Sequence, residues 1–280
     1  MTTAKLGAEA LRQEKGGVTF LQFPRFADPK LVPHAVTTRL GGVSRGVFQS
    51  LNLSFKVGDE KVRVDENRSL LERALGFELS DAAWVEQVHG DEVVVLTAAN
   101  LPKRGESLGK ADALITQQKG IPLLIQVADC LPVLFYDPTH QAIGLAHAGW
   151  RGTVSHIAVK TLLAMGEHFG SKPEDVRAVL GPCIGACCYE VGDEVRKEFT
   201  KVFPWGAEVF ETHQKGQWKL DLAGANARQL MEMGLKQEHL LRSGLCTVGH
   251  SKIFYSHRAE AGPEKSTGRF GALLMLNGKP

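Results

Sequence analysis

Short apolar stretches between residues 92 and 147 constrain the fold of this chain most strongly. They lie at 92–96, 112–116, 122–128, 132–136 and 142–147. Each is short and rich in aliphatic or β-branched side chains, which is typical of strands. Patterns with helical spacing occur on both sides of them. Because helices and strands alternate without regular βαβ units, we expect an α/β (α+β) layered fold with mixed sheets.

Two helices have clear ends in the sequence. Residues 61–76 carry apolar side chains at helical offsets and finish at Gly76, a residue type that commonly ends helices. A second helix is expected from Thr153, as its N-cap, to Phe169, with Gly170 as its stop. Further patterns predict helices near 192–200 and 221–234 and strands at 177–181, 252–256 and 270–276.

The composition and the lack of linker-like segments favour one globular domain. Hydrophobic residues make up 43% and charged residues 23% of the 280 residues, which is ordinary for a folded domain. Residues 1–17 are polar and are expected to form a flexible leader. No Pro/Ser-rich linker or low-complexity segment follows. Residues 18–280 are therefore expected to form a single catalytic domain.

Charge and hydropathy exclude several classes of partner. The formal net charge is only +2, and Lys and Arg are dispersed, so neither nucleic acid nor a membrane surface is expected to bind. The chain lacks a run of about 18 apolar residues, and its N-terminus lacks the apolar stretch of a signal peptide. We therefore expect a cytoplasmic protein. Its five cysteines, an odd number, argue against a disulfide framework and leave thiols free to bind metal.

Two histidines and one cysteine form the strongest candidate site. His89, Cys130 and His147 lie in stretches rich in glycine or small residues, namely QVHGDE, VADCLPVLFYD and LAHAGWRGT. Cys130 and His147 also lie at the ends of expected strands, where functional groups often occur. Two imidazoles and a thiolate suit Zn²⁺, and three protein ligands leave one coordination position open. The pattern therefore predicts an enzyme.

The spacing of these residues does not by itself establish a metal site. His89 precedes Cys130 by 41 positions, and Cys130 precedes His147 by 17, so the ligands have to converge through the fold. Taken alone, a cysteine beside a strand is more often an inert buried thiol. A lone histidine beside glycine is more often a turn residue or a satisfied core group.

The turn after His147 is a candidate anion site. Gly149 and Gly152 permit close backbone approach, the following helix begins with free N–H groups, and Arg151 adds positive charge. Arg39 is a second candidate for binding phosphate, because it precedes a Gly-Gly pair. The alternative for either arginine is a solvated surface charge.

Several motifs together closely resemble one family. They are HG at 89–90, ADCLPVLFYD at 128–137, HAGWRGT at 147–153, GPCIGACCYEVG at 181–192 and FYSHR at 254–258. These motifs are similar to those of the YfiH family, also called the laccase-domain or polyphenol oxidase family, whose members are described as purine nucleoside phosphorylases. The resemblance extends from about Thr37 to Leu276. It implies an α/β/β/α sandwich, shared with cysteine-dependent deamidating toxins.

The resemblance also bears on individual residues. It implies a role near the substrate for Arg258, whereas His250 is expected to be ordinary. The motif with Cys183, Cys187 and Cys188 is interpreted as a structured loop beside the site, and its C-x₃-C-C spacing does not fit a zinc knuckle. The remaining histidines have no other candidate ligands or catalytic residues near them in the sequence and are expected in surface or core roles: His34, His140, His156, His168, His213 and His239.

The leading hypothesis is a zinc-dependent purine nucleoside phosphorylase that cleaves adenosine, inosine or S-methyl-5′-thioadenosine with phosphate. Adenosine deamination is a further expected activity, since zinc held by His and Cys can activate water for attack on C6 of adenine. The expected metal and catalytic residues are His89, Cys130 and His147, with Cu²⁺ as the alternative metal. The expected phosphate-binding residues are Arg39, Arg151 and Arg258.

Other classes of protein remain open from the residues alone. In an amidase-like cysteine hydrolase for peptidoglycan precursor editing, Cys130 is a nucleophile activated by His147. A copper polyphenol oxidase ranks third, because one His/Cys/His set does not supply the several copper centres that four-electron O₂ chemistry uses. A binding module without catalysis gives no reason for a thiolate and two imidazoles. Only Asp129 and Glu86 stand out as acid/base carboxylates.

Overall fold

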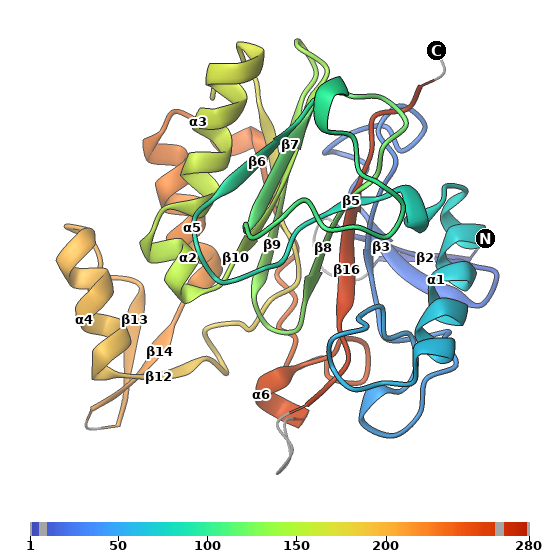
Figure 1. Cartoon of the computed structure of the whole chain (residues 1–280). Helices are drawn as coiled ribbons and strands as arrows, with labels where there is room; N and C mark the ends of the chain where they lie inside the picture. The colour runs from blue at the N-terminus through green and yellow to red at the C-terminus, as the bar shows by residue number, and fades with distance from the viewer. Residues whose placement is uncertain (1, 6–9, 215, 261–265, 279–280) are drawn as a thin grey trace.

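The chain folds into two large mixed β-sheets that pack face to face, with helices on both outer faces (Figure 1). The structure is a computed structural model that describes residues 2–5, 10–214, 216–260 and 266–278. Within these ranges, no helix combines the length and the apolar character needed to cross a membrane.

The first sheet has seven strands in the order β1-β2-β3-β4-β16-β8-β5. They are β1 (Thr2–Lys5), β2 (Leu11–Lys15), β3 (Val18–Gln22), β4 (His34–Thr37), β5 (Ala83–Trp84), β8 (Leu123–Val127) and β16 (Phe270–Leu274). Neighbouring strands are antiparallel except β5 and β8, which are parallel. The last of the described strands, β16, therefore lies inside the sheet, between β4 and β8.

The second sheet has six strands in the order β15-β11-β9-β10-β7-β6. They are β6 (Val93–Leu96), β7 (Ala113–Thr116), β9 (Leu131–Asp137), β10 (Ala142–Ala148), β11 (Arg177–Leu180) and β15 (Leu240–Arg242). The four central strands are antiparallel, and the edge strands β6 and β15 each pair in parallel. A small third sheet contains β12 (Glu190–Gly192), β13 (Phe210–Gln214) and β14 (Gln217–Leu220).

Helices complete the layers on the two outer faces. The first sheet is covered by α1 (Lys61–Leu75). The second sheet is covered by α2 (Trp150–Val154), α3 (Ile157–Phe169) and α5 (Leu222–Glu232), while α4 (Asp193–Val202) packs beside the third sheet. A short helix, α6 (His257–Glu260), precedes β16. The order of layers is therefore helix, sheet, sheet, helix.

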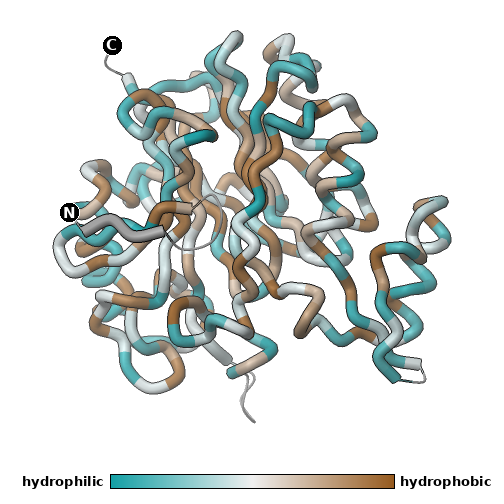
Figure 2. Tube along the Cα trace, turned by 180° about the vertical axis from the view of Figure 1, so that it is seen from behind, coloured by the Kyte–Doolittle hydropathy of each residue, from teal (hydrophilic) through white to brown (hydrophobic). Residues whose placement is uncertain are grey.

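The hydrophobic core fills the space between the sheets and the space under the helices. Leu21 and Ile125 from the first sheet meet Leu134 and Leu145 from the second. Along β9 the neighbouring Phe135 points the other way, toward the helices. Both faces of the central strands are therefore buried, which explains why these strands are continuous apolar runs in the sequence. Figure 2 shows the hydrophobic segments concentrated on the central strands.

The predicted layered fold with mixed sheets is confirmed. The five apolar stretches between 92 and 147 form β6, β7, β8, β9 and β10, each within one or two residues of the predicted bounds. The helix α1 ends before Gly76, which has a left-handed φ of 84° as a helix-terminating glycine should. These elements carry their own local signals, so the sequence places them well.

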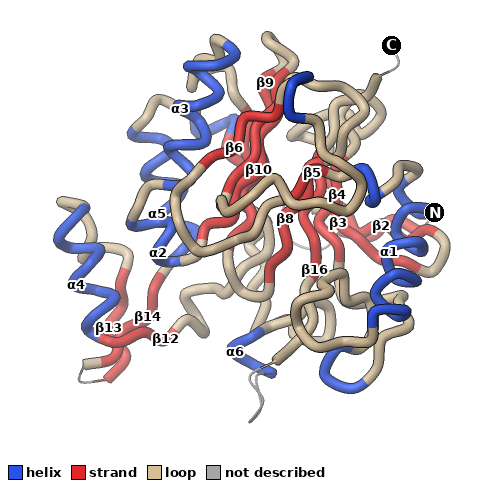
Figure 3. Tube along the Cα trace, viewed as in Figure 1, coloured by secondary structure: helices blue, strands red, loops and turns tan. Residues whose placement is uncertain are grey.

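The helix expected from Thr153 to Phe169 is instead two helices, because the chain turns at His156 with a φ of 64° (Figure 3). Thr153 lies inside α2 and does not cap a helix. Its hydroxyl donates to Gly149 O at 2.9 Å. Side chains of α5 fill the break: Asn226 Nδ2 donates to the Thr153 hydroxyl, and Gln229 Nε2 donates to the Thr153 carbonyl. A distant helix thus decides this break.

The strand expected at 252–256 is wrong. This segment forms a turn before α6 (Figure 3), in which the N–H groups of Ile253 and Phe254 both donate to His250 O, at 2.7 and 3.0 Å. Phe254 and Tyr255 are fully buried. The apolar run therefore reflects burial of a turn, which the pattern of residues alone does not distinguish from a strand.

The segment 1–17, expected to be a flexible leader, contributes two strands to the first sheet. β1 pairs with β2, and β2 pairs with β3 across the turn at Gly16 and Gly17. Backbone hydrogen bonds at a sheet edge do not require apolar side chains, so a polar segment can extend the sheet. The boundary expected at residue 18 therefore falls inside a hairpin. Residues 1 and 6–9 lie outside the described part of the chain.

Candidate metal centre and pocket

Antiparallel pairing brings the predicted ligands to one edge of the second sheet. β10 pairs with β9 on one side and with β7 on the other. His147 lies near the end of β10, Cys130 directly precedes β9, and Asp112 directly precedes β7. Antiparallel neighbours start and end at the same edge, so these three residues become neighbours in space. His89 reaches them from the loop between β5 and β6.

The three predicted metal ligands converge at this edge. Their ligand atoms all lie within 4.8 Å of one another, and His89 Nε2 is 3.8 Å from Cys130 Sγ. The rings of His89 and His147 meet edge to face, with centroids 4.8 Å apart. His147 is buried, Cys130 is half-buried and His89 is exposed. The group therefore has one side open to solvent.

Asp112 organises the site, and sequence reasoning missed it. Its Oδ1 accepts hydrogen bonds from His147 Nδ1 at 2.7 Å and from the His89 N–H at 3.0 Å. Its Oδ2 accepts from the N–H groups of Val88 at 3.2 Å and Gly90 at 2.6 Å. The bond to Nδ1 leaves His147 Nε2 free to bind a metal. The other bonds fix the loop in which His89 has a left-handed φ of 59°.

Burial and charge act against each other at Cys130 and His147. Burial raises the pKa of the Cys130 thiol, but His147 and His89 together outweigh it and lower that pKa to about 6. Burial lowers the pKa of His147, while Cys130 and the hydrogen bond to Asp112 raise it to about 9. The metal-free pair therefore favours a thiolate beside an imidazolium. The thiolate is also the form of cysteine that binds zinc.

Gly149 leaves space beside the ligand atoms. A Cβ at this position would lie 3.1 Å from both Cys130 Sγ and His89 Cδ2, so any larger residue would crowd the two ligands. The donor set itself, two imidazoles and one thiolate, suits Zn²⁺ and not a hard cation such as Mg²⁺. The residues present therefore fit a zinc ion.

The ligand group opens into a pocket of about 570 Å³, a volume within the range of small-molecule sites. The residues that line it include four aromatic side chains and four arginines: Phe55, Trp84, Trp150, Tyr189, Arg68, Arg151, Arg258 and Arg269. The carboxylates Glu86 and Asp129, both singled out in the sequence, also line it. Such a lining suits a planar ligand together with an anion.

Two of the three arginines expected to bind phosphate line this pocket. Arg151 is exposed, and its guanidinium lies 4.3 Å from the ring centroid of Trp150. Arg258 is also exposed; its Nη1 donates to Glu190 O at 2.8 Å, and its guanidinium lies 5.4 Å from the ring centroid of Tyr189. Within the described part of the chain, neither guanidinium pairs with a carboxylate. Both charges are therefore available to a ligand.

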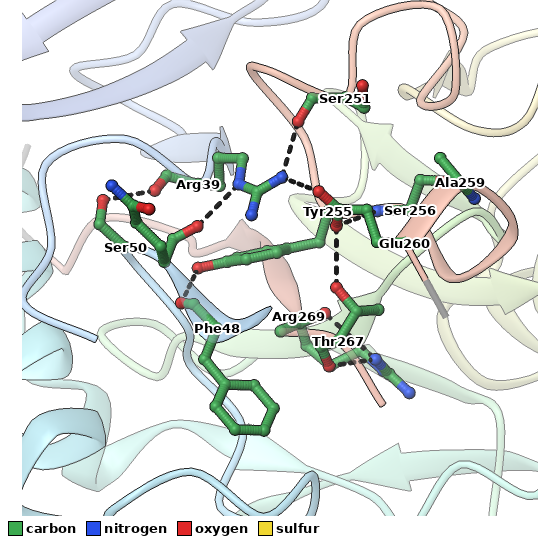
Figure 4. A network of polar contacts seen from close by, with 12 residues as sticks. Arg39, Phe48, Ser50, Ser251, Tyr255, Ser256, Ala259, Glu260, Thr267 and Arg269 are labelled. Atoms are coloured by element: carbon green, nitrogen blue, oxygen red, sulfur yellow. Dashed lines mark hydrogen bonds and ion pairs between the residues drawn. The ribbon is translucent and has the colours of Figure 1, made fainter. Parts of the chain in front are cut away.

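Arg39, the third arginine, does not line the pocket. Its guanidinium belongs to the polar network in Figure 4, where it donates to Gln49 O and Ser251 O, both at 2.7 Å, and pairs with Glu260. It also lies 4.6 Å from the ring centroid of Tyr255. Because Glu260 already pairs with Arg39, we expect this residue to stabilise the fold, and its phosphate role stays a prediction.

The loop with Cys183, Cys187 and Cys188 lies beside the site, as its motif indicated. The N–H of Ile184 in this loop donates to the carbonyl of Asp129, the residue before Cys130, at 2.8 Å. Sequence reasoning missed Cys246, whose sulfur joins those of Cys187 and Cys188, because 58 positions separate it from Cys188. It also missed Arg68 and Arg269, which lie in no recognisable motif.

Comparison with known proteins identifies the family. A family model described as multi-copper polyphenol oxidoreductase laccase matches residues 33–277. The chain therefore belongs to this family, as its motifs indicated.

Relatives that match nearly the whole chain are named purine nucleoside phosphorylases. One from Deinococcus radiodurans is 41% identical over 260 residues, covering 93% of this chain and 94% of the relative. Purine nucleoside phosphorylase YfiH from Escherichia coli is 34% identical over 253 residues, covering 90% and 97%. The crystal structure of YlmD from Geobacillus stearothermophilus matches with a TM-score of 0.87 at 33% identity, covering 98% of this chain and all of that one.

Proposed function

We propose that this chain is a purine nucleoside phosphorylase whose site holds Zn²⁺ through His89, Cys130 and His147. The observation that supports it best is the position of this ligand group in a cationic and aromatic pocket of about 570 Å³. Relatives at 41% and 34% identity carry the same functional name. When bound, Zn²⁺ supplies a Lewis acid with an open coordination position.

Phosphorolysis requires a cradle for inorganic phosphate beside the glycosidic bond. Arg151 and Arg258 supply it, because each presents a guanidinium that can bind two phosphate oxygens at once. The stacking of Arg151 on Trp150 and of Arg258 on Tyr189 restricts both guanidinium groups before phosphate arrives. Fixed positive charge then stabilises the charge that develops as the bond breaks.

The aromatic wall suits the purine base of adenosine, inosine or S-methyl-5′-thioadenosine, because a planar base stacks on aromatic faces. Among the pocket carboxylates, both oxygens of Asp129 already accept hydrogen bonds, one from the Thr247 hydroxyl at 2.5 Å and the other from the backbone N–H of Arg258 at 2.6 Å. Among the residues that the structure describes, the carboxylate of Glu86 has a single long ion pair, with Lys56 at 3.5 Å. Glu86 is therefore the carboxylate assigned to exchange a proton with the substrate.

Incubation of the purified protein with adenosine, with and without phosphate, tests this function. Adenine and ribose 1-phosphate are the expected products with phosphate, and inosine formed without phosphate reports deamination. Elemental analysis distinguishes Zn²⁺ from Cu²⁺. We expect Cys130→Ala to lose metal and phosphorolysis together, and Arg258→Ala to raise the KM for phosphate while retaining the metal. Zinc-replete protein that leaves adenosine unchanged in phosphate would refute the proposal.

A cysteine hydrolase of the amidase type, acting on peptidoglycan precursors, is the second candidate. It is favoured by one observation, the position of the Cys130 sulfur within 4.8 Å of a His147 ring nitrogen. Alkylation separates the two functions. A zinc-bound thiolate resists iodoacetamide until a chelator removes the metal, whereas a nucleophilic Cys130 is labelled readily and its activity survives chelation. We expect the first result.

A further inference from the structure

A second group of thiols lies on two loops that leave the second sheet side by side. Cys187 and Cys188 lie between β11 and β12, and Cys246 follows β15, the parallel neighbour of β11. The three Sγ atoms lie within 4.8 Å of one another, and those of Cys187 and Cys188 are 3.3 Å apart. None of these three cysteines lines the pocket. The group is therefore separate from the proposed zinc ligands.

The surrounding backbone favours a negative charge on this group and holds it in place. Cys246 Sγ accepts hydrogen bonds from the N–H groups of Gly185 at 3.3 Å and Gly249 at 3.4 Å. Converging N–H groups stabilise an anion. Cys183 and Cys246 also form a β-bridge that joins the two loops. A Cβ at Gly185 would lie 3.1 Å from Cys246 Cβ and 3.4 Å from Cys187 Sγ, so glycine permits this close packing.

We propose that Cys187, Cys188 and Cys246 bind one Cu⁺ ion as a three-thiolate site. Thiolates are soft ligands that select Cu⁺ or Zn²⁺. Structural zinc sites use four protein ligands, whereas this group contains three sulfurs and, among the described residues, no histidine or carboxylate. The soft monovalent ion is therefore favoured. Cys187 is exposed and the other two are half-buried, so an ion reaches the site from solvent.

Binding at this site is coordination without a redox step. The S–H bonds of the cysteines are replaced by S–Cu bonds, and the protons go to the buffer. Copper enters and stays as Cu⁺, so no oxidant or reductant takes part. The three-thiolate site retains a net negative charge, which the N–H groups of Gly185 and Gly249 face. The site does not depend on the proposed phosphorylase function.

Anaerobic titration of reduced, metal-stripped protein with Cu⁺, against a chromogenic Cu⁺ chelator, tests the site. The titration uses the Cys130→Ala background, because this change removes the thiolate of the other metal-ligand group. We expect one tightly bound Cu⁺ per chain, with X-ray absorption showing sulfur-only coordination. Zn²⁺ added in place of Cu⁺ is expected to be released to a chelator of comparable strength.

Two further variants make the assignment specific. Cys130→Ala/Cys246→Ser should lose this bound Cu⁺. If this variant fails to fold, Cys130→Ala/Cys187→Ser/Cys188→Ser gives the same readout. Cys183→Ala in the Cys130→Ala background is the matched control, because Cys183 lies on the same loop outside the group; it should keep one Cu⁺. Nitrogen ligands in the absorption spectrum, tight Zn²⁺ retention, or undiminished Cu⁺ binding in either of these two serine variants would overturn the proposal.

Discussion

Replacing Asp112 by asparagine isolates the role of this carboxylate in holding the metal ligands. Each carboxylate oxygen accepts two hydrogen bonds, one pair from Val88 and Gly90 and the other from His89 and His147. Whichever way the new amide is turned, its NH₂ group faces two donors. Two hydrogen bonds to a charged group are lost, each with a contribution of about 1.5–3 kcal/mol. Allowing for relaxation of the loop, the free energy of unfolding should fall by roughly 3 kcal/mol.

The same change should weaken metal binding. If the NH₂ group of the new amide faces His147, the Nδ1 proton is no longer held and Nε2 is no longer reserved for the metal. If the amide oxygen faces His147, it accepts the Nδ1 proton but holds it more weakly than the carboxylate does. Loss of such a partner costs about 10- to 100-fold in metal affinity, or about 1.4–2.7 kcal/mol. Competition with a zinc-binding dye gives the affinity, and urea unfolding gives the stability. Both are measured at a temperature at which circular dichroism shows the variant folded.

Asp137→Asn is the matched control. Asp137 is also fully buried, and it accepts hydrogen bonds from the N–H groups of Thr139 and His140 and from His140 Nδ1. It lies at the other end of β9 from Cys130. Its variant should lose comparable stability and keep full zinc affinity. Equal zinc affinity in wild type and Asp112→Asn, or equal weakening in both variants, would refute this reasoning.

Three further predictions concern residues in different parts of the molecule. Burial lowers the pKa of His34 from 6.5 to about 4. The stability that neutral His34 provides above pH 6.5 should therefore decline by about 3 kcal/mol as the pH falls to 4, and the urea midpoint over this range should fall less for His34→Gln than for the wild type. Arg39→Ala leaves Glu260 without its cation and should lower the free energy of unfolding by about 3 kcal/mol, while the KM for phosphate stays unchanged. A raised KM for phosphate at unchanged stability would show instead that Arg39 binds phosphate. Gly149→Ala should weaken zinc binding about 10-fold through crowding, and an unchanged affinity in the dye competition would contradict the steric argument.

Elements with local signals could be predicted from the sequence, and elements decided by distant contacts could not. The end of α1 at Gly76 and the buried strands β9 and β10 follow from residues within each segment. The break at His156 depends on α5, which lies about 70 positions further along the chain. The apolar residues at 252–256 are buried by packing and not by strand pairing, so periodicity misassigned them.

The residues of the site also divide into those with a local sequence signal and those placed by distant contacts. His89, Cys130 and His147 were found because their motifs are short and unusual. Asp112 reads as the first residue of an ordinary strand, and only the pairing of β7 with β10 reveals that its carboxylate meets His147. For Arg39 the Gly-Gly motif was visible, but its partner Glu260 lies 221 positions away. Charge compensation over such separations leaves no trace in local sequence.

The position of β16 inside the first sheet sets the order in which the chain can mature on the ribosome. Among the described strands, β16 lies between β4 and β8, so two parts of this sheet wait with exposed edges until residues 270–274 have been synthesised and can pair. Unpaired edges of this kind recruit other strands, including those of neighbouring nascent chains. Premature stop codons shortly before residue 270 should therefore yield aggregated protein, even though every proposed zinc ligand has already been translated.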